Sequence, residues 1–128
     1  MRLLLDTCTL LWVAAGSDRL SERARSLFAD PGNTVLLSAV SAWEIAVKHR
    51  LGRLPLPAPP QALVPELRET YGLVPLPLAE EAAVLAAGLP DHHRDPFDRL
   101  LVCQAMAEGL VILTPDEQIA RYPVRTAW

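Results

Sequence analysis

The sequence has few cysteines, no excess of basic residues and no long uninterrupted apolar run, and each shortage excludes a class of protein. Its two cysteines, Cys8 and Cys103, lack the spacing of a zinc site and are typical of reduced core thiols rather than a disulfide. Twelve Lys and Arg against fifteen Asp and Glu give a formal net charge of −3, so the chain lacks the overall basic surface of a simple nucleic-acid-binding domain. Any contact with nucleic acid must therefore be local or mediated by a metal.

Charges or prolines interrupt every long apolar segment well short of the roughly 18 residues that a membrane-spanning helix requires. The stretch from Met1 to Gly16 also matches a signal peptide poorly, because Asp6 falls inside it and only Arg2 precedes it. With 128 residues, 51% of them hydrophobic, the chain has enough apolar material for one core. We therefore expect one domain over residues 1–128, soluble, cytoplasmic and without membrane contact.

Segments that suit buried strands alternate with segments that suit helices. The expected strands are Arg2 to Asp6, Thr34 to Ser38, Leu73 to Leu76, Leu110 to Leu113 and an edge strand within Val124 to Trp128. The expected helices are Thr7 to Ala15, Glu22 to Ala29, Ser41 to Leu51, Gln61 to Tyr71, Ala79 to Ala87, Asp95 to Gly109 and a short one from Thr114. The strands are too continuously apolar for a sheet with one solvated face. This pattern predicts a three-layer α/β/α domain with a mainly parallel central sheet.

Four carboxylates stand where a predicted strand or loop gives way to a helix: Asp6, Glu44, Asp98 and Asp116. In an open α/β sheet the carboxyl ends of the strands and the adjacent helix starts converge on one crevice. Four acids there repel one another unless a cation lies among them, and oxygen ligands suit Mg²⁺ or Mn²⁺. Such a hydrated cluster can polarise a phosphoryl oxygen and activate a water, so we predict phosphodiester hydrolysis.

Most of these acids also have a structural interpretation as helix caps. Capping-box spacing pairs Ser41 with Glu44, Asp95 with Asp98, and Thr114 with Glu117 beside Asp116. Asp6 has no such explanation, because its nearest basic residue, Arg2, is at the other end of the predicted strand. The capping alternative therefore stays open for each acid except Asp6.

The four segments that carry the acids also match a known family in order and composition. They are Leu3-Leu4-Leu5-Asp6-Thr7, Ser38 to Ala46 continuing to Leu51-Gly52-Arg53-Leu54, His93 to Arg99, and Leu113-Thr114-Pro115-Asp116-Glu117. Together they span almost the whole chain. They resemble the PIN-domain family, and more closely the VapC-type toxins of bacterial type II toxin–antitoxin systems.

The resemblance implies an endoribonuclease that depends on Mg²⁺, for which Mn²⁺ can substitute, and that hydrolyses RNA phosphodiesters with a metal-bound water. Its catalytic residues are expected to be Asp6, Glu44, Asp98 and Asp116. Of these, Asp6 and Asp98 match the positions of direct metal contact. Thr7 and Asp95 are expected beside the site in supporting roles, with Asp95 as a helix N-cap. The resemblance further implies a homodimer and a neutralising VapB-like antitoxin.

Basic and aromatic residues near the acids are weaker candidates. Lys48, Arg50, Arg94 and Arg99 are candidate RNA contacts, with solvated surface as the alternative and, for Lys48, an ordinary helix ion pair with Glu44. The histidines, His93 among them, are expected as loop or cap groups, because the acids already supply hard oxygen donors. Trp43 falls on an apolar helix pattern that is more typical of a core or interface than of base stacking.

Two other classes of protein share part of this pattern. A haloacid-dehalogenase-like phosphatase also begins with an apolar strand ending in aspartate, but it needs a second aspartate where this chain has Cys8. A catalytically silent PIN-like module that binds RNA or protein is the main alternative, because a fold does not fix a function.

Overall fold

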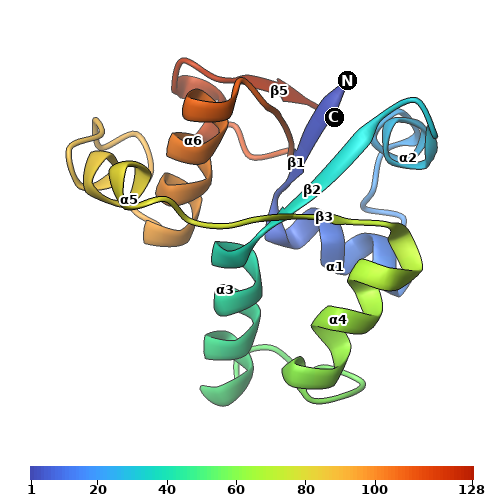
Figure 1. Cartoon of the computed structure of the whole chain (residues 1–128). Coiled ribbons are helices and arrows are strands. Elements are labelled where there is room, and N and C mark those ends of the chain that lie inside the picture. Colours follow the sequence, from blue (N-terminus) through green and yellow to red (C-terminus); the bar gives the residue numbers. More distant parts are fainter.

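One sheet of five parallel strands crosses the structure, a computed structural model that describes all residues 1–128 (Figure 1). The strands are β1 (Arg2–Leu5), β2 (Thr34–Ser38), β3 (Val74–Leu76), β4 (Val111–Leu113) and β5 (Arg125–Ala127), in the spatial order β3-β2-β1-β4-β5. Every neighbouring pair is parallel. Because β1 is the central strand, Asp6 leaves the sheet in the middle of its carboxyl edge.

Helices cover both faces of this sheet. They are α1 (Thr7–Ala15), α2 (Glu22–Ala29), α3 (Ala39–Arg50), α4 (Pro60–Tyr71), α5 (Glu80–Ala87) and α6 (Pro96–Glu108). Figure 1 shows α5 and α6 on one side of the sheet and α1, α2 and α4 on the other. Alternate residues of β1 face opposite layers, so Leu4 belongs to one buried cluster while Leu3 and Leu5 belong to the second. The predicted three-layer α/β/α architecture is confirmed.

The helix α3 contributes to both layers. Val40 packs in the cluster beneath α5 and α6, whereas Ile45 packs in the cluster beneath α1 and α4. Figure 1 shows α3 extending from the carboxyl end of β2, between the two groups of helices. None of the helices has the length and apolar character that crossing a membrane requires.

The predicted start of α3 at Ser41 is wrong. The N-cap is Ser38, whose Oγ accepts a hydrogen bond from the Val40 amide at 3.0 Å and donates one to Gln104 Oε1 at 2.5 Å. The hydroxyl of Ser41 is buried inside the helix without a hydrogen-bond partner. Both serines are good caps, but Ser38 is the one that ends β2 and meets Gln104. Glu44 therefore lies in the second turn of α3 and does not close a capping box.

The predicted helix from Thr114 is also wrong. Thr114 Oγ1 accepts a hydrogen bond from the Asp116 amide at 3.0 Å, and Asp116 Oδ1 accepts one from the Gln118 amide at 2.8 Å. These local side-chain bonds form turns in place of a helix, and only a 3₁₀ turn, Ile119–Arg121, follows. Asp116 consequently lies in a loop after β4.

Candidate active site

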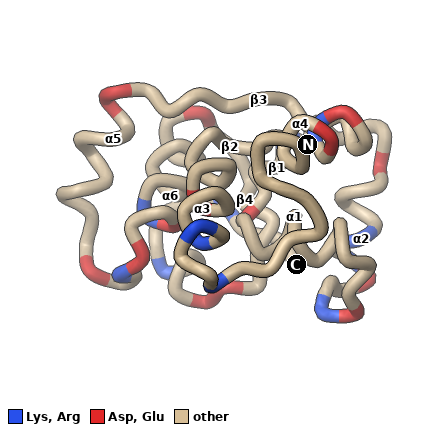
Figure 2. Tube along the Cα trace, turned by 90° about the horizontal axis from the view of Figure 1, so that it is seen from below, with Lys and Arg blue, Asp and Glu red and all other residues tan.

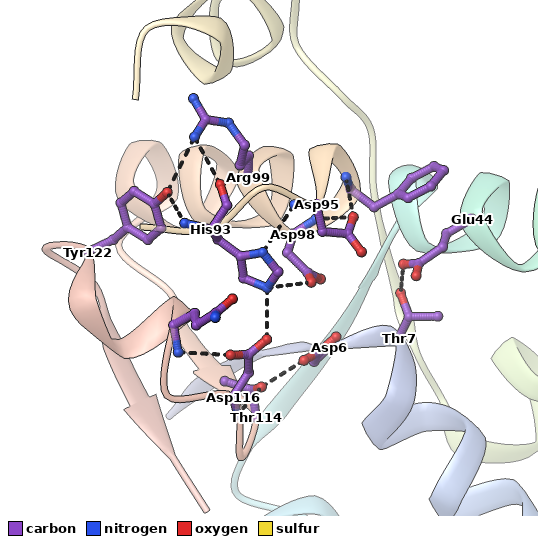
Figure 3. Close-up of polar contacts among 12 residues, drawn as sticks. Asp6, Thr7, Glu44, His93, Asp95, Asp98, Arg99, Thr114, Asp116 and Tyr122 are labelled. Atoms are coloured by element: carbon purple, nitrogen blue, oxygen red, sulfur yellow. Dashed lines mark hydrogen bonds and ion pairs between the residues drawn. The ribbon is translucent and has the colours of Figure 1, made fainter. Parts of the chain in front are cut away.

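Three aspartates from distant parts of the chain meet at the carboxyl edge of the sheet. Asp6 follows β1 and precedes α1, Asp98 is the third residue of α6, and Asp116 lies in the loop after β4. Figure 3 shows their carboxyl groups directed into the same space. Asp95 accepts hydrogen bonds from the amides of Phe97 and Asp98, as expected for the N-cap of α6. This cap fixes the helix turn that carries Asp98.

The carboxyl group of Asp98 is in an environment that disfavours its charge. Burial is the largest cause, and the charges of Asp6, Asp95, Glu44 and Asp116 add to it, which together raise the pKa of Asp98 to about 8. Without a cation, the ionised form of Asp98 is therefore disfavoured. A cation bound among these oxygens would remove the repulsion.

Asp6 is buried, and its surroundings shift the pKa of its carboxyl group in both directions. Burial raises the pKa of Asp6, hydrogen bonds from Thr114 and Cys8 lower it, and the charges of Glu44 and Asp116 raise it, with a net upward shift. Thr114 Oγ1 donates to Asp6 Oδ2 at 2.7 Å. This bond orients the carboxylate at the end of the central strand.

Glu44 approaches the cluster from α3 and is held by two partners. The hydroxyl of Thr7 donates to Glu44 Oε1 at 2.6 Å, and Lys48, one turn further along α3, forms an ion pair with Oε2. Both carboxylate oxygens are thus engaged by side chains (Figure 3 shows the bond from Thr7). The predicted ion pair between Lys48 and Glu44 is present. Thr7 lies beside the site and contacts it by its hydrogen bond to Glu44.

His93 joins two of the acids, which the sequence did not predict. Its Nε2 lies 3.0 Å from Asp98 Oδ2 and 2.9 Å from Asp116 Oδ2. Its Nδ1 accepts a hydrogen bond from the Asp95 amide at 3.1 Å, so Nδ1 carries a lone pair and Nε2 carries the proton. His93 therefore donates a hydrogen bond to Asp116, and the same nitrogen lies beside the carboxyl group of Asp98. The available hint was its place two residues before the N-cap of the helix that bears Asp98.

The donor set fits a hard divalent cation. Ligand atoms of His93, Asp98 and Asp116 all lie within 4.8 Å of one another. Because the Nε2 of His93 carries a proton in this arrangement, the ligands that remain are carboxylate oxygens, including those of Asp6. Oxygen ligands without thiolate or imidazole suit Mg²⁺ and Mn²⁺ better than zinc.

Arg99 and Tyr122 hold the loop that carries His93. The guanidinium of Arg99 donates to the carbonyl oxygens of His93, Pro90, Ala86 and Leu89 at 2.8–3.1 Å. The hydroxyl of Tyr122 accepts from the His93 amide at 3.0 Å and donates to the Pro90 carbonyl at 2.6 Å. Arg99, in α6, thus holds this loop through its side chain, which is 12% exposed.

The other predicted RNA contacts lie at the surface. Arg50 ends α3 and Arg94 precedes the N-cap of α6, and both are exposed. Figure 2 shows basic positions at the end of α3, among acidic positions elsewhere on that face. The basic character near the site is therefore local, as the net charge requires.

Known proteins share both the sequence pattern and the fold. Ribonuclease VapC16 of Mycobacterium tuberculosis is 42% identical over 76 residues, which cover 58% of this chain and 53% of that protein. The matched region thus spans about half the length of VapC16. Ribonuclease VapC22 of the same organism is 29% identical over 119 residues, covering 91% of this chain and 88% of the relative.

Solved structures with low sequence identity share the fold. The structure of VapBC2 from Rickettsia felis bound to a DNA fragment from their promoter superposes with a TM-score of 0.72 at 15% identity, covering 100% of this chain and 99% of the other. DNA-bound VapBC from Salmonella typhimurium gives a TM-score of 0.65 at 18% identity, with 99% and 97% covered.

The parallel sheet, the helices on both faces and the acids at the carboxyl edge define an α/β/α domain with an acidic site. The PIN domain family model matches residues 3–124. The chain belongs to the PIN domain family, and the resemblance seen in its four acidic segments is confirmed.

Proposed function

We propose that this chain is a divalent-cation-dependent endoribonuclease and the toxin of a type II toxin–antitoxin system. The observation that carries the proposal is the convergence of Asp6, Asp98 and Asp116 on one space, with Glu44 at its side. Both curated relatives are named ribonucleases, and the structural neighbours are VapBC complexes. These names support the same activity and the same type of partner here.

The four acids share two roles in the proposed mechanism. Asp6 and Asp98 would hold the cation, Mg²⁺ or in its place Mn²⁺, and Asp116 and Glu44 would complete the acidic site. When bound, the cation supplies Lewis acidity at the phosphoryl oxygen and lowers the pKa of a water. Thr114 orients Asp6, Thr7 orients Glu44, and the Asp95 cap positions Asp98. No protein nucleophile is required.

Other polar groups serve the site without reacting. His93 donates to Asp116 and lies against Asp98, which keeps these two carboxyl groups in place. Lys48, Arg50 and Arg94 provide local positive charge for the RNA backbone. Arg99 does not belong to this set, because its guanidinium donates to the hydroxyl of Tyr122 and to four backbone carbonyls, one in α5 and three in the loop that follows it.

The proposal extends to partners and location. We expect a homodimer, neutralised by a VapB-like antitoxin that covers the acidic site, acting on RNA in the cytoplasm. The alternative is a PIN-like module that binds RNA or protein without turnover. Besides turnover, the two differ in cation binding, because a silent module has no need to bind a cation at Asp98.

Cation-dependent cleavage is the direct test. The purified chain should cut single-stranded RNA with Mg²⁺ or Mn²⁺, stop cutting with a chelator, and resume when Mn²⁺ is restored. Asp98→Asn should lose cleavage, whereas Asp18→Asn, the same change at an exposed turn between α1 and α2, should keep it. Asp98→Asn purified in parallel also controls for contaminating nucleases. Cleavage that survives the chelator, or equal cleavage by Asp98→Asn, rejects the proposed chemistry.

The toxin role requires a separate test in cells. Induction of the chain should arrest growth, and co-expression of the neighbouring reading frame should relieve the arrest. Asp98→Asn should not arrest growth. Sequencing of the RNA 5′ ends after brief induction identifies the cleaved RNA. An active nuclease that leaves growth unchanged would retain the enzymatic assignment and lose the toxin assignment.

A further inference from the structure

A solvent-exposed tryptophan stands next to the acidic site. Trp43 is 60% exposed on α3 and immediately precedes Glu44. Core packing does not account for its position, because more than half of this large side chain remains in water. Of the two positions that the sequence pattern suggested for Trp43, the core is therefore wrong.

Phe97 fixes the indole in place. The two rings are 5.2 Å apart between centroids, with 67° between their planes, an edge-to-face contact. Phe97 immediately precedes Asp98, as Trp43 immediately precedes Glu44. Lys48, which pairs with Glu44, also lies over the Phe97 ring, so this aromatic pair borders the acidic site on its Glu44 side.

A cation accompanies the pair. Lys48 Nζ lies 5.8 Å from the centroid of the Phe97 ring and also pairs with Glu44. Arg94, which is also exposed, lies just before α6, the helix that carries Phe97. Exposed aromatic surface combined with local positive charge is the chemistry that binds single-stranded nucleic acid, in which bases stack and phosphates meet cations.

We propose that Trp43, braced by Phe97, is a stacking platform for an unpaired base of the RNA next to the phosphate that is cleaved. This inference rests on the proposed function, because it takes RNA as the substrate of the adjacent site. Trp43 is then a specificity-determining residue: it favours single-stranded or looped RNA, whose bases are free to leave a helix, over duplex RNA.

Kinetics of matched variants test the role of Trp43. Trp43→Ala should raise the KM for single-stranded RNA about tenfold with kcat nearly unchanged, the range expected for one lost base–aromatic stack. Trp43→Phe should recover most of the loss. Val84→Ala is the control. It shortens a highly exposed apolar side chain on a different helix, α5, and should leave KM unchanged. Thermal melts of all variants should coincide, because Trp43 is largely exposed.

Abasic substitution separates stacking from a structural effect. In an Asp6→Asn background, intended to bind without cutting, the affinity of an end-labelled single-stranded RNA is measured with each base removed in turn. Removal of the base at one position should lower the affinity about tenfold. In the protein that also carries Trp43→Ala, removal of the same base should have no effect. Such coupling supports the platform.

The remaining outcomes overturn the platform or the proposed function separately. If the parent cleaves RNA and Trp43→Ala has an unchanged KM, the platform is wrong and the nuclease stands. If Trp43→Ala alters only the oligomeric state or antitoxin binding, this face is a protein interface and the platform is wrong. If the parent does not cleave RNA, the nuclease assignment fails, while the abasic scan still decides whether Trp43 stacks a base; no coupling there rejects the platform as well.

Discussion

The hydroxyl of Thr114 donates a 2.7 Å hydrogen bond to Oδ2 of Asp6, which joins the loop after β4 to the end of the central strand. The same oxygen atom of Thr114 accepts from the Asp116 amide. One side chain therefore sets both the orientation of a buried acid and the turn that presents a second one. This bond also lowers the pKa of Asp6 against the opposing effect of burial.

Thr114→Val should weaken cation binding more than it weakens the fold. The valine removes the donor to Asp6, so we expect the pKa of Asp6 to rise further and the affinity for Mn²⁺ to fall. The unfolding free energy should drop by about 1–3 kcal/mol, because a buried polar group loses its partner. Thr9→Val is the matched control, since Thr9 donates to the Leu113 carbonyl at 2.7 Å and contacts no acid of the site. Calorimetric Mn²⁺ titration of both variants decides; equal affinities contradict the role of Thr114.

Asp6→Asn should abolish RNA cleavage without lowering the stability of the metal-free protein. Asparagine removes one negative charge from a group of acids that raise one another's pKa, and its carbonyl can still accept from Thr114. We therefore expect a thermal midpoint equal to or above that of the parent in the presence of chelator. A fall of several degrees would show that Asp6 serves the fold rather than a cation.

Metal-free protein should lose stability as the pH rises. Burial and neighbouring charges raise the pKa of Asp98 from its ordinary value of 3.8 to about 8. Between those two values the unfolded chain has released a proton that the folded chain retains. The unfolding free energy therefore falls with rising pH across this window, by at most about 1.4 kcal/mol per pH unit for one proton.

Denaturant titrations at several pH values measure this dependence. Asp98→Asn should flatten the profile between pH 5 and 8, leaving the smaller dependence that the raised pKa of Asp6 contributes in the same direction. Asp18→Asn should keep the profile of the parent. Saturating Mn²⁺ should also flatten it, because the cation favours the deprotonated acids. Stability that increases from pH 5 to 8 in chelator is the contrary result.

The sequence predicts the parts of this site that depend on local patterns. Leucines 3 to 5 form a buried strand in any parallel sheet, and an acid directly after such a strand must lie at its carboxyl edge. The choice between Ser38 and Ser41 as N-cap was not local, because both can cap a helix. It depends on Gln104, 66 residues away, which bonds to Ser38.

The position of His93 required the folded loop. Its sequence neighbours indicate a turn before a capped helix, but its contact with Asp116 spans 23 residues. That contact exists because Arg99 and Tyr122 bond to the backbone around it. Such backbone hydrogen bonds leave no pattern in the sequence, so Arg99 resembled a surface cation there.

Arg99→Ala should destabilise the protein and weaken its active site together. The substitution leaves several carbonyl oxygens without their donor, among them those of Ala86, Leu89 and His93, so we expect a loss of about 2–4 kcal/mol in unfolding free energy. Arg99→Lys should not restore it, because one ammonium group cannot reproduce a planar fork of donors. Arg94→Ala, at an exposed arginine of the loop before α6, should change stability by less than about 0.5 kcal/mol. Denaturant unfolding measures all three, and hydrogen exchange at the His93 amide should accelerate only in the Arg99 variants. If Arg99→Ala were as stable as Arg94→Ala, and its His93 amide as protected, the side chain would be free to contact RNA as the sequence first suggested.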